Sequence, residues 1–248
     1  MKVVNTQKFK SLPEAIFFDL DNTFYSYDHA HTVAIKAVQK KTFKKIGIKE
    51  DDFYKSFNEA KVIVKNQLGN VAASHSRLLY FTKMFEIIGL KSQVFLSLDL
   101  EKTYWRVFLK NAILFDGVED CLDEIRILGI PMAIITDLTT QIQYEKLIYF
   151  NLDNYFDFIV TSEESGFDKP NPKSFSLAIS KTNLDSNNIW MIGDCPKKDI
   201  LGAREAIGAI CIQKIHTGVN LGDKDCIPDA FFNHFTDFQQ FIKKIERQ

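Results

Sequence analysis

The segment at positions 16–24 constrains this chain most, because an apolar run there ends abruptly in two aspartates. The run, IFF at 16–18, is typical of a buried strand, and Asp19, Asp21 and Thr23 follow it. Side chains alternate along a strand, so both carboxylates share a face only while the chain stays extended. Where the chain turns at the carboxyl end of the strand, both carboxylates can point into one cleft.

The spacing of these carboxylates suggests a bound cation. Two carboxylates that lie close together repel each other, which raises a pKa unless a cation sits between them. Mg²⁺ is the natural cation, because it prefers hard oxygen ligands. The segment is therefore a candidate metal and catalytic site. The alternative is a strand followed by an acidic, Asn-containing turn.

Five later segments resemble partners of this strand. They are short apolar runs, most of which end in polar or glycine residues, at 131–136, 156–161, 189–194, 209–212 and 230–232. Helical patterns separate them, at 118–128, 141–150, 172–181 and 200–206. Strands that alternate with helices predict an α/β fold, with a Rossmann-like parallel sheet covered on both faces. Such sheets bind ligands at the carboxyl ends of their strands.

The stretch after the aspartates behaves differently, because it shows helical periodicity and no strand-like run. We expect an α/β core domain at 1–24 and 112–248, and a second, smaller all-α domain at 25–111. An insertion at the catalytic edge of a sheet can act as a lid. The alternative is a helical subdomain that serves packing only.

Charge and cysteine content exclude several classes of partner. The net charge of −1, from 31 basic and 32 acidic residues, gives no electrostatic case for nucleic acid or an anionic membrane. No apolar run is long enough to span a bilayer, and the first ten residues lack the apolar stretch of a signal peptide. The four cysteines form no C-x-x-C pair, which fits a reducing compartment. We expect a cytoplasmic monomer or homodimer.

Polar residues near the predicted strand ends form an ordered set of motifs. They are DLDNT at 19–23, Thr136, Lys169 within ESGFDKP, and Asp194 and Asp199 within GDCPKKDILGA. In this order the motifs resemble those of the haloacid dehalogenase-like hydrolase superfamily, over nearly all of the predicted core. The resemblance implies a Rossmann-like core and identifies the helical insertion as a cap of the C1 type.

The resemblance also implies a role for each acidic residue. Asp19 would be the nucleophile that forms an aspartyl-phosphate, and Asp21 would protonate the leaving oxygen and later deprotonate water. Asp19, Asp194 and the backbone carbonyl of Asp21 would hold Mg²⁺, which binds a phosphate oxygen and screens the nucleophile. Asp199 would steady the metal site through water or Lys169.

Thr136 and Lys169 are the expected phosphate contacts. Thr136 would donate its hydroxyl, and Lys169 would neutralise charge on both Asp19 and the phosphate. Asp137 follows Thr136 at the substrate-binding edge, where Asn is frequent in this superfamily. A carboxylate there repels a phosphate unless it points away or meets a cation. The motif cysteine, Cys195, is expected to be structural or incidental.

Asp21 distinguishes between reaction classes. Dehalogenases of this superfamily lack the second aspartate, because a halide leaves without a proton. This chain has Asp21, so it resembles a phosphatase, that is, a phosphoric monoester hydrolase. The first expected substrate is a nucleoside 5′-monophosphate, because DNTFY at 21–25 is similar to pyrimidine-type 5′-nucleotidases. Sugar phosphates and phosphoglycolate are alternatives. Other candidate functions are a phosphomutase, a dehalogenase-type hydrolase, and a non-catalytic protein that binds a phosphorylated ligand or a protein.

Residues in and beside the predicted cap are candidates for substrate specificity: Tyr25, Asp28, His29, His31, His75, Arg77 and Trp105. Arg77 can grip a second anion, or it can simply be exposed. A lone histidine on a helix is more often packed or solvated than a ligand, and a tryptophan more often fills a core.

Overall fold

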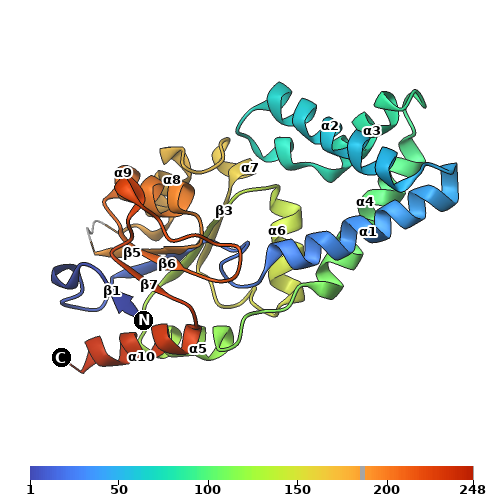
Figure 1. Ribbon diagram of the computed structural model, residues 1–248. Helices are drawn as coiled ribbons and strands as arrows, with labels where there is room; N and C mark the ends of the chain where they lie inside the picture. Colours follow the sequence, from blue (N-terminus) through green and yellow to red (C-terminus); the bar gives the residue numbers. More distant parts are fainter. Residues whose placement is uncertain (185–187, 248) are drawn as a thin grey trace. The chain divides into compact units, whose positions relative to one another are not determined.

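The chain divides into two compact units (Figure 1), seen in a computed structural model that describes residues 1–184 and 188–247. The sheet unit comprises Met1–Ser26 and Ile113–Gln248, and the helical unit comprises Tyr27–Ala112. Tyr25 belongs to the sheet unit because its backbone forms isolated β-bridges with Asp21 and Leu114.

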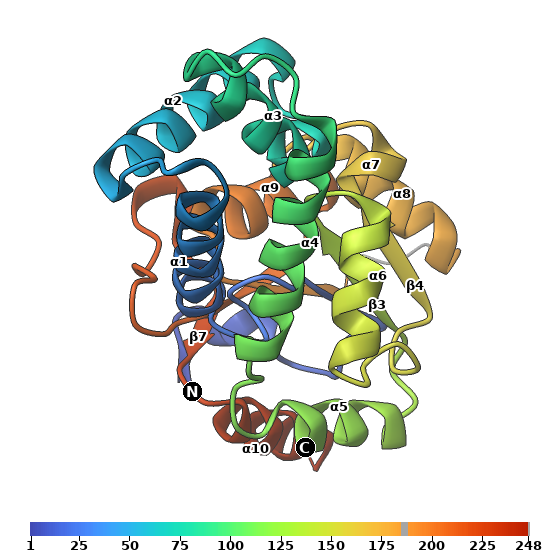
Figure 2. The ribbon, with the colours of Figure 1, turned by 90° about the vertical axis from the view of Figure 1, so that its right-hand side faces the viewer.

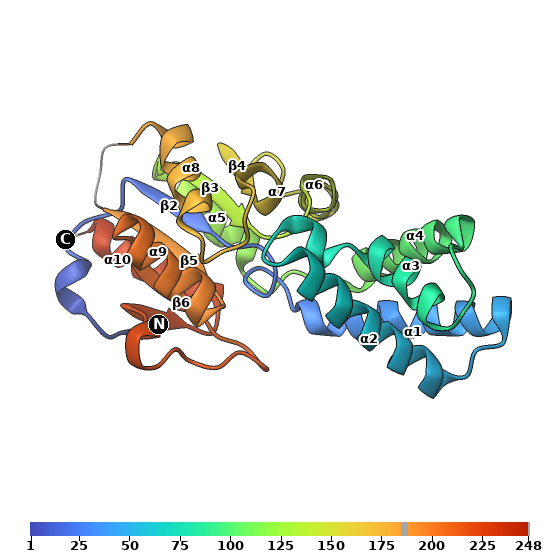
Figure 3. The same ribbon diagram turned by 90° about the horizontal axis from the view of Figure 1, so that it is seen from above.

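In the part of the chain that the structure describes, the sheet unit contains seven strands. They are β1 Lys2–Val3, β2 Ala15–Phe18, β3 Met132–Thr136, β4 Phe158–Thr161, β5 Ile189–Gly193, β6 Ile210–Lys214 and β7 Ala230–Phe232. Their order is β1-β7-β6-β5-β2-β3-β4, and Figure 3 shows the run from β4 to β6. All neighbours are parallel except β1 and β7. The predicted α/β fold is confirmed; the two-residue β1 was too short to show an alternating pattern.

Helices cover both faces of this sheet (Figure 1). One face carries α8 Pro172–Thr182 and α9 Gly202–Ile207, and the other carries α5 Val118–Ile127 and α10 Phe235–Glu246. The connection from β3 to β4 contains α6 Thr140–Tyr149. The remaining short elements are η1 Thr6–Lys8, α7 Ser162–Ser165, the π-helix η3 Pro196–Leu201 and η4 Lys224–Cys226.

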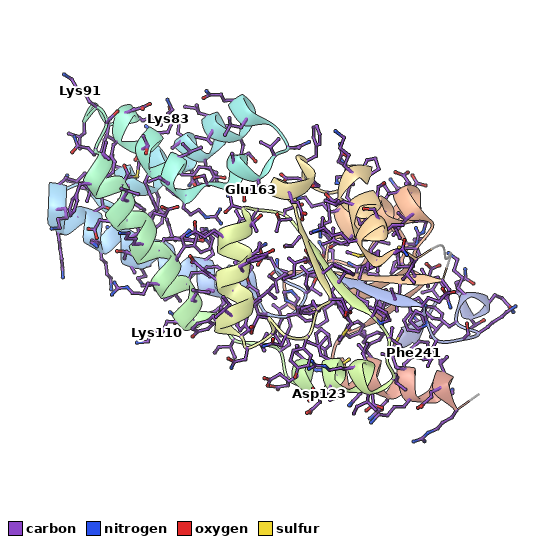
Figure 4. All side chains as sticks on the ribbon, turned by 180° about the vertical axis from the view of Figure 1, so that it is seen from behind. Lys83, Lys91, Lys110, Asp123, Glu163 and Phe241 are labelled. Atoms are coloured by element: carbon purple, nitrogen blue, oxygen red, sulfur yellow. The ribbon has the colours of Figure 1, made fainter. Side chains whose placement is uncertain are left out.

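Side chains of β2 alternate between two cores, as expected for a strand buried on both faces. Phe17 belongs to the core formed with α8 and α9, whereas the ring centroid of Phe18 lies 5.3 Å from that of Phe24. On the α10 side, Phe241 is labelled in Figure 4, and its ring centroid lies 5.3 Å from that of Phe9 and 6.2 Å from that of Trp190. Because both faces are covered, only the ends of the strands are left for polar chemistry.

The helical unit is built from four long helices. They are α1 Tyr27–Ile46, α2 Glu50–Leu68, α3 Arg77–Ile87 and α4 Val94–Asn111, with the short η2 Ala72–His75 between α2 and α3. Helix α1 packs on α4 and α2 packs on α3 (Figure 2). Among residues 1–184 and 188–247, no helix combines the length and apolar character that a membrane span requires.

Candidate active site

The candidate site lies at the carboxyl ends of three neighbouring strands of the sheet unit. Asp19 and Asp21 follow β2, Thr136 ends β3, and Asp194 follows β5. The central strand β2 pairs in parallel with both β3 and β5, so the three chain ends emerge at the same edge. The fold thus brings together residues that are more than a hundred positions apart in the sequence.

Lys169 is the centre of a buried set of charges. Its side chain is almost fully buried, and Nζ donates to Asp19 Oδ1 at 2.7 Å, to Asp199 Oδ1 at 2.6 Å and to the carbonyl oxygen of Ile135 at 2.7 Å. The other oxygen of Asp19 accepts a hydrogen bond from Thr23 Oγ1 at 2.9 Å. A lysine between two carboxylates neutralises part of their charge. Here Lys169 contacts only one of the two carboxyl oxygens of Asp19.

Three carboxylates at this edge form a group that can hold a metal ion. Asp19, Asp194 and Asp199 each offer one oxygen, and these oxygens lie within 4.8 Å of one another. Burial, and then the charges of neighbouring aspartates, raises the pKa of Asp194 above its ordinary value; burial likewise raises the pKa of Asp19, although Lys169 opposes the shift. A hard cation relieves this repulsion, so the donor set fits Mg²⁺.

Asp199 is held at this edge by its backbone surroundings. Its Oδ2 accepts the N–H of Cys195 at 2.9 Å, while Oδ1 accepts from Lys169. The carboxyl group lies directly against Gly193, where an added Cβ would be only 2.4 Å from Asp199 atoms. Glycine in the GD motif is therefore required for the close approach of Asp199. With both oxygens already bonded, Asp199 is suited to supporting the site.

Asp21 pairs with a different lysine from the one that contacts Asp19. Lys146, whose side chain is 0% exposed, donates to Asp21 Oδ1 at 2.7 Å and to Oδ2 at 2.8 Å. The hydroxyl of Tyr25 and, at 3.4 Å, the amide of Gln143 also donate to the carboxylate. Burial raises the pKa of Asp21, but Lys146 and the hydrogen bonds outweigh burial, so the pKa lies below its ordinary value. Both side-chain oxygens of Asp21 therefore already accept hydrogen bonds from neighbouring residues.

Asp137 meets a cation, which is one of the two arrangements expected for a carboxylate beside a predicted phosphate contact. Its Oδ2 lies 2.6 Å from Lys198 Nζ, and Oδ1 accepts the backbone N–H of Lys169 at 2.9 Å. Thr136 Oγ1 accepts a hydrogen bond from Gln143 at 2.6 Å and donates its own proton weakly, at 3.4 Å, to the carbonyl oxygen of Asp137. Asp137 therefore connects the end of β3 with the segment of Lys169 and with η3. A direct contact between Asp137 and substrate stays a prediction.

Lys146 and Gln143 were missed by sequence reasoning. Both lie on α6, and a lysine within a helix is ordinarily solvated. The available signal was their spacing of three residues, which places both on one face of the helix beside the buried Leu147. That face of α6 is buried, and buried polar side chains need hydrogen-bond partners within the protein.

Several of the predicted specificity residues gather in the helical unit. Arg77 is 8% exposed, and its guanidinium donates to the carbonyl oxygen of His75 and to the hydroxyl of Tyr27. It also lies 5.3 Å from the ring centroid of Trp105. His31 is half-buried, and burial, followed by the charge of Arg77, lowers its pKa to about 4. The arrangement is a buried aromatic cluster around a cation, so Arg77 is not an exposed side chain.

The haloacid dehalogenase-like hydrolase family matches residues 13–206, and the chain belongs to this family. The ribulose-1,5-bisphosphate 5-phosphatase of Halopiger xanaduensis is 34% identical over 196 residues, which are 78% of this chain and 81% of that protein. The glyceraldehyde 3-phosphate phosphatase of Methanothermobacter thermautotrophicus is 29% identical over 196 residues, covering 78% and 82%. The expectation of a phosphatase-type hydrolase of this family is confirmed.

Solved structures share the fold across different chemistries. A 2-haloacid dehalogenase from Pseudomonas syringae pv. Tomato superposes with a TM-score of 0.70 at 21% identity, covering 94% of this chain and 99% of that one. A likeness at this identity concerns the fold alone, because one fold carries many functions. The choice between reactions therefore depends on individual residues at the strand ends.

Proposed function

We propose that this protein is a Mg²⁺-dependent phosphatase that hydrolyses a small phosphorylated sugar through an aspartyl-phosphate on Asp19. The observation that carries the proposal is the separation of two neighbouring carboxylates into different surroundings. Asp19 is paired with Lys169 in the acidic group, whereas Asp21 is paired with Lys146. Carboxylates with different environments can take different roles, one as nucleophile and one in proton transfer.

Each half of the reaction uses these two side chains in turn. An oxygen of Asp19 attacks phosphorus while the bond from phosphorus to the leaving oxygen breaks, and that oxygen takes a proton from Asp21. Water then attacks phosphorus, its proton passes to Asp21, and the bond to Asp19 breaks. The lowered pKa of Asp21 favours the ionised form, which is the form that accepts the proton of water in the second half. Thr136 and Lys169 bind the phosphate oxygens.

The metal would be held by Asp19, Asp194 and the backbone carbonyl of Asp21, with Asp199 in support. When bound, Mg²⁺ neutralises charge on the phosphate and the nucleophile, so that two anions can approach each other. The raised pKa values of Asp19 and Asp194 support this assignment, because burial and neighbouring carboxylates disfavour the charged forms, and a bound cation would offset that cost.

The relatives support a sugar phosphate as the first substrate class, since two of them are named for phosphorylated sugars. A nucleoside 5′-monophosphate remains the candidate that the DNTFY segment predicts. The cap role of residues 25–111, a cytoplasmic location and a monomeric or homodimeric state also remain predictions from the sequence.

Phosphate release from a panel of substrates tests the proposal. The panel contains p-nitrophenyl phosphate, glyceraldehyde 3-phosphate, ribulose 1,5-bisphosphate and a nucleoside 5′-monophosphate, each with Mg²⁺ and after chelation. We expect Mg²⁺-dependent release, highest kcat/KM on a sugar phosphate, and loss of release in Asp19→Asn. Release that is highest on the nucleotide would overturn the substrate class. No release from any member would favour a protein that binds phosphorylated ligands without turnover.

A further inference from the structure

The buried lysine on α6 is placed to control the direction of the Asp21 carboxyl group. Lys146 Nζ contacts both Asp21 oxygens, at 2.7 and 2.8 Å, and the lysine side chain has no exposed surface. Burying an ion pair costs desolvation energy that its attraction often only balances, so such a pair is weak evidence of a role in stability. A fixed geometry for the carboxylate is the property that this pair does supply.

Two further donors restrict the same carboxylate. The Tyr25 hydroxyl donates to Oδ1, the oxygen that also accepts from Lys146. Gln143 Nε2 lies 3.4 Å from Oδ2, and 2.6 Å from both Thr136 Oγ1 and the carbonyl oxygen of Asp137. The amide therefore connects the proposed proton-transfer residue with a proposed phosphate contact.

The helix that carries Gln143 and Lys146 is itself anchored at its first turn. The backbone N–H of Thr140 donates to Glu163 Oε2 at 2.8 Å, and Thr140 Oγ1 lies 2.7 Å from Thr161 Oγ1. Glu163 is labelled in Figure 4. A carboxylate at a helix N-terminus is favourable because it meets unpaired N–H groups and the positive end of the helix dipole. The position of Lys146 is thus fixed by bonds outside the site.

We propose that Lys146 is a positioning residue that, with the Tyr25 hydroxyl, holds the Asp21 carboxyl group where it exchanges a proton with the leaving oxygen. The inference rests on the proposed function of Asp21. It extends that function because Lys146 is proposed to act on the reaction through Asp21, whose two carboxyl oxygens it contacts.

Two esters of similar shape test the proposal, because their leaving groups differ in their need for a proton. Phenolate, whose conjugate acid has a pKa of about 10 like that of tyrosine, leaves far better with a proton. p-Nitrophenolate is a much weaker base and leaves without one. Since a positioned acid contributes about 10²–10⁴-fold, a misdirected Asp21 should slow phenyl phosphate hydrolysis selectively.

The variant Lys146→Met is expected to lose about tenfold or more of kcat on phenyl phosphate and less than about threefold on p-nitrophenyl phosphate. Asp21→Asn should show the same selectivity with a larger loss. Tyr25→Phe, which keeps the ring and removes one donor, should change the ratio in the same direction by about two- to fivefold. The matched control Lys181→Met removes a different ion pair, with Glu164, and should leave the ratio unchanged.

Equal losses on both esters, or no loss, in a folded Lys146→Met protein would overturn the inference. If that variant does not fold, a wild-type ratio in Tyr25→Phe overturns it. Failure of the underlying function looks different: either the wild-type protein releases no phosphate from either ester, or Asp21→Asn keeps the wild-type ratio. Native circular dichroism and an unchanged Mg²⁺ requirement are checked in every variant.

Discussion

Replacement of Lys169 by methionine gives the sharpest perturbation of the charged centre. The side chain is 3% exposed, and its ammonium group donates to Asp19, Asp199 and the carbonyl oxygen of Ile135. Methionine fills a similar length with no charge, so the change removes three hydrogen bonds and leaves two buried carboxylates without their cation. Lys169 also lowers the pKa of Asp19, and its loss favours the protonated, non-nucleophilic form.

The substitution is expected to lower both kcat and Tm, and the contacts of Lys169 indicate the size of each effect. Loss of one preorganised contact to developing charge costs about 10²–10³ in kcat. Breaking a buried ion pair by removing one partner costs about 3–5 kcal/mol, a large part of the roughly 5–15 kcal/mol that stabilises a domain. For a protein of this size, about 1 kcal/mol corresponds to roughly 2–4 °C in Tm. We therefore expect Lys169→Met to be folded at 15 °C but to melt about 6–20 °C earlier.

The assay is steady-state hydrolysis of p-nitrophenyl phosphate with Mg²⁺, together with thermal melting followed by circular dichroism. Lys243→Met is the control, because Lys243, whose side chain is 37% exposed, forms an ion pair near the surface with Glu124 at 2.7 Å. Such surface pairs contribute about 0–1 kcal/mol, so its Tm and kcat should stay near the wild-type values. A folded Lys169→Met protein with kcat within about fivefold of wild type would refute the proposed role of Lys169 in binding the phosphate and assisting Asp19.

Two further predictions concern the metal edge. Gly193→Ala should reduce Mg²⁺-dependent activity more than about tenfold, because the new Cβ lies 2.4 Å from Asp199 atoms and must displace that carboxyl group; wild-type kcat and Mg²⁺ affinity would contradict this. The pKa values of Asp19 and Asp194 are raised in the folded protein above their ordinary value of 3.8. In the metal-free protein, the free energy of unfolding is therefore highest below pH 3.8 as far as these two groups are concerned, and it falls as the pH rises toward the raised pKa values. The gain in Tm on adding Mg²⁺ should therefore be larger near about pH 8 than near about pH 5, and an equal or reversed gain in melting experiments would contradict the cation assignment.

Much of the sheet unit follows from local patterns in the sequence. Apolar runs bounded by polar residues predict β2 through β7, and the meeting of parallel strand ends predicts that Asp19, Thr136 and Asp194 share one edge. These inferences succeed because strand burial and strand direction are encoded locally. The position of Lys169 follows less directly, from a loop whose sequence is recognisable.

Contacts across long sequence separations could not be predicted. Lys146 reaches Asp21 from 125 positions away, and Lys198 reaches Asp137 from 61 positions away. Either lysine alone has the pattern of a solvated surface residue, and only tertiary packing gives it a carboxylate partner. Arg77 illustrates the same limit in the helical unit. The sequence is equally compatible with a solvated Arg77, whereas the structure encloses its guanidinium among aromatic side chains.

The most direct test of the central claim is the location of the phosphoryl group during turnover. The protein is mixed with p-nitrophenyl phosphate and Mg²⁺, quenched in acid within milliseconds to seconds, digested, and read by peptide mass spectrometry. We predict a phosphoryl group on Asp19, in the peptide that contains DLDNT, and its absence in Asp19→Asn. Turnover without any phosphorylated peptide, or with the phosphoryl group on another residue, would contradict the nucleophilic role of Asp19.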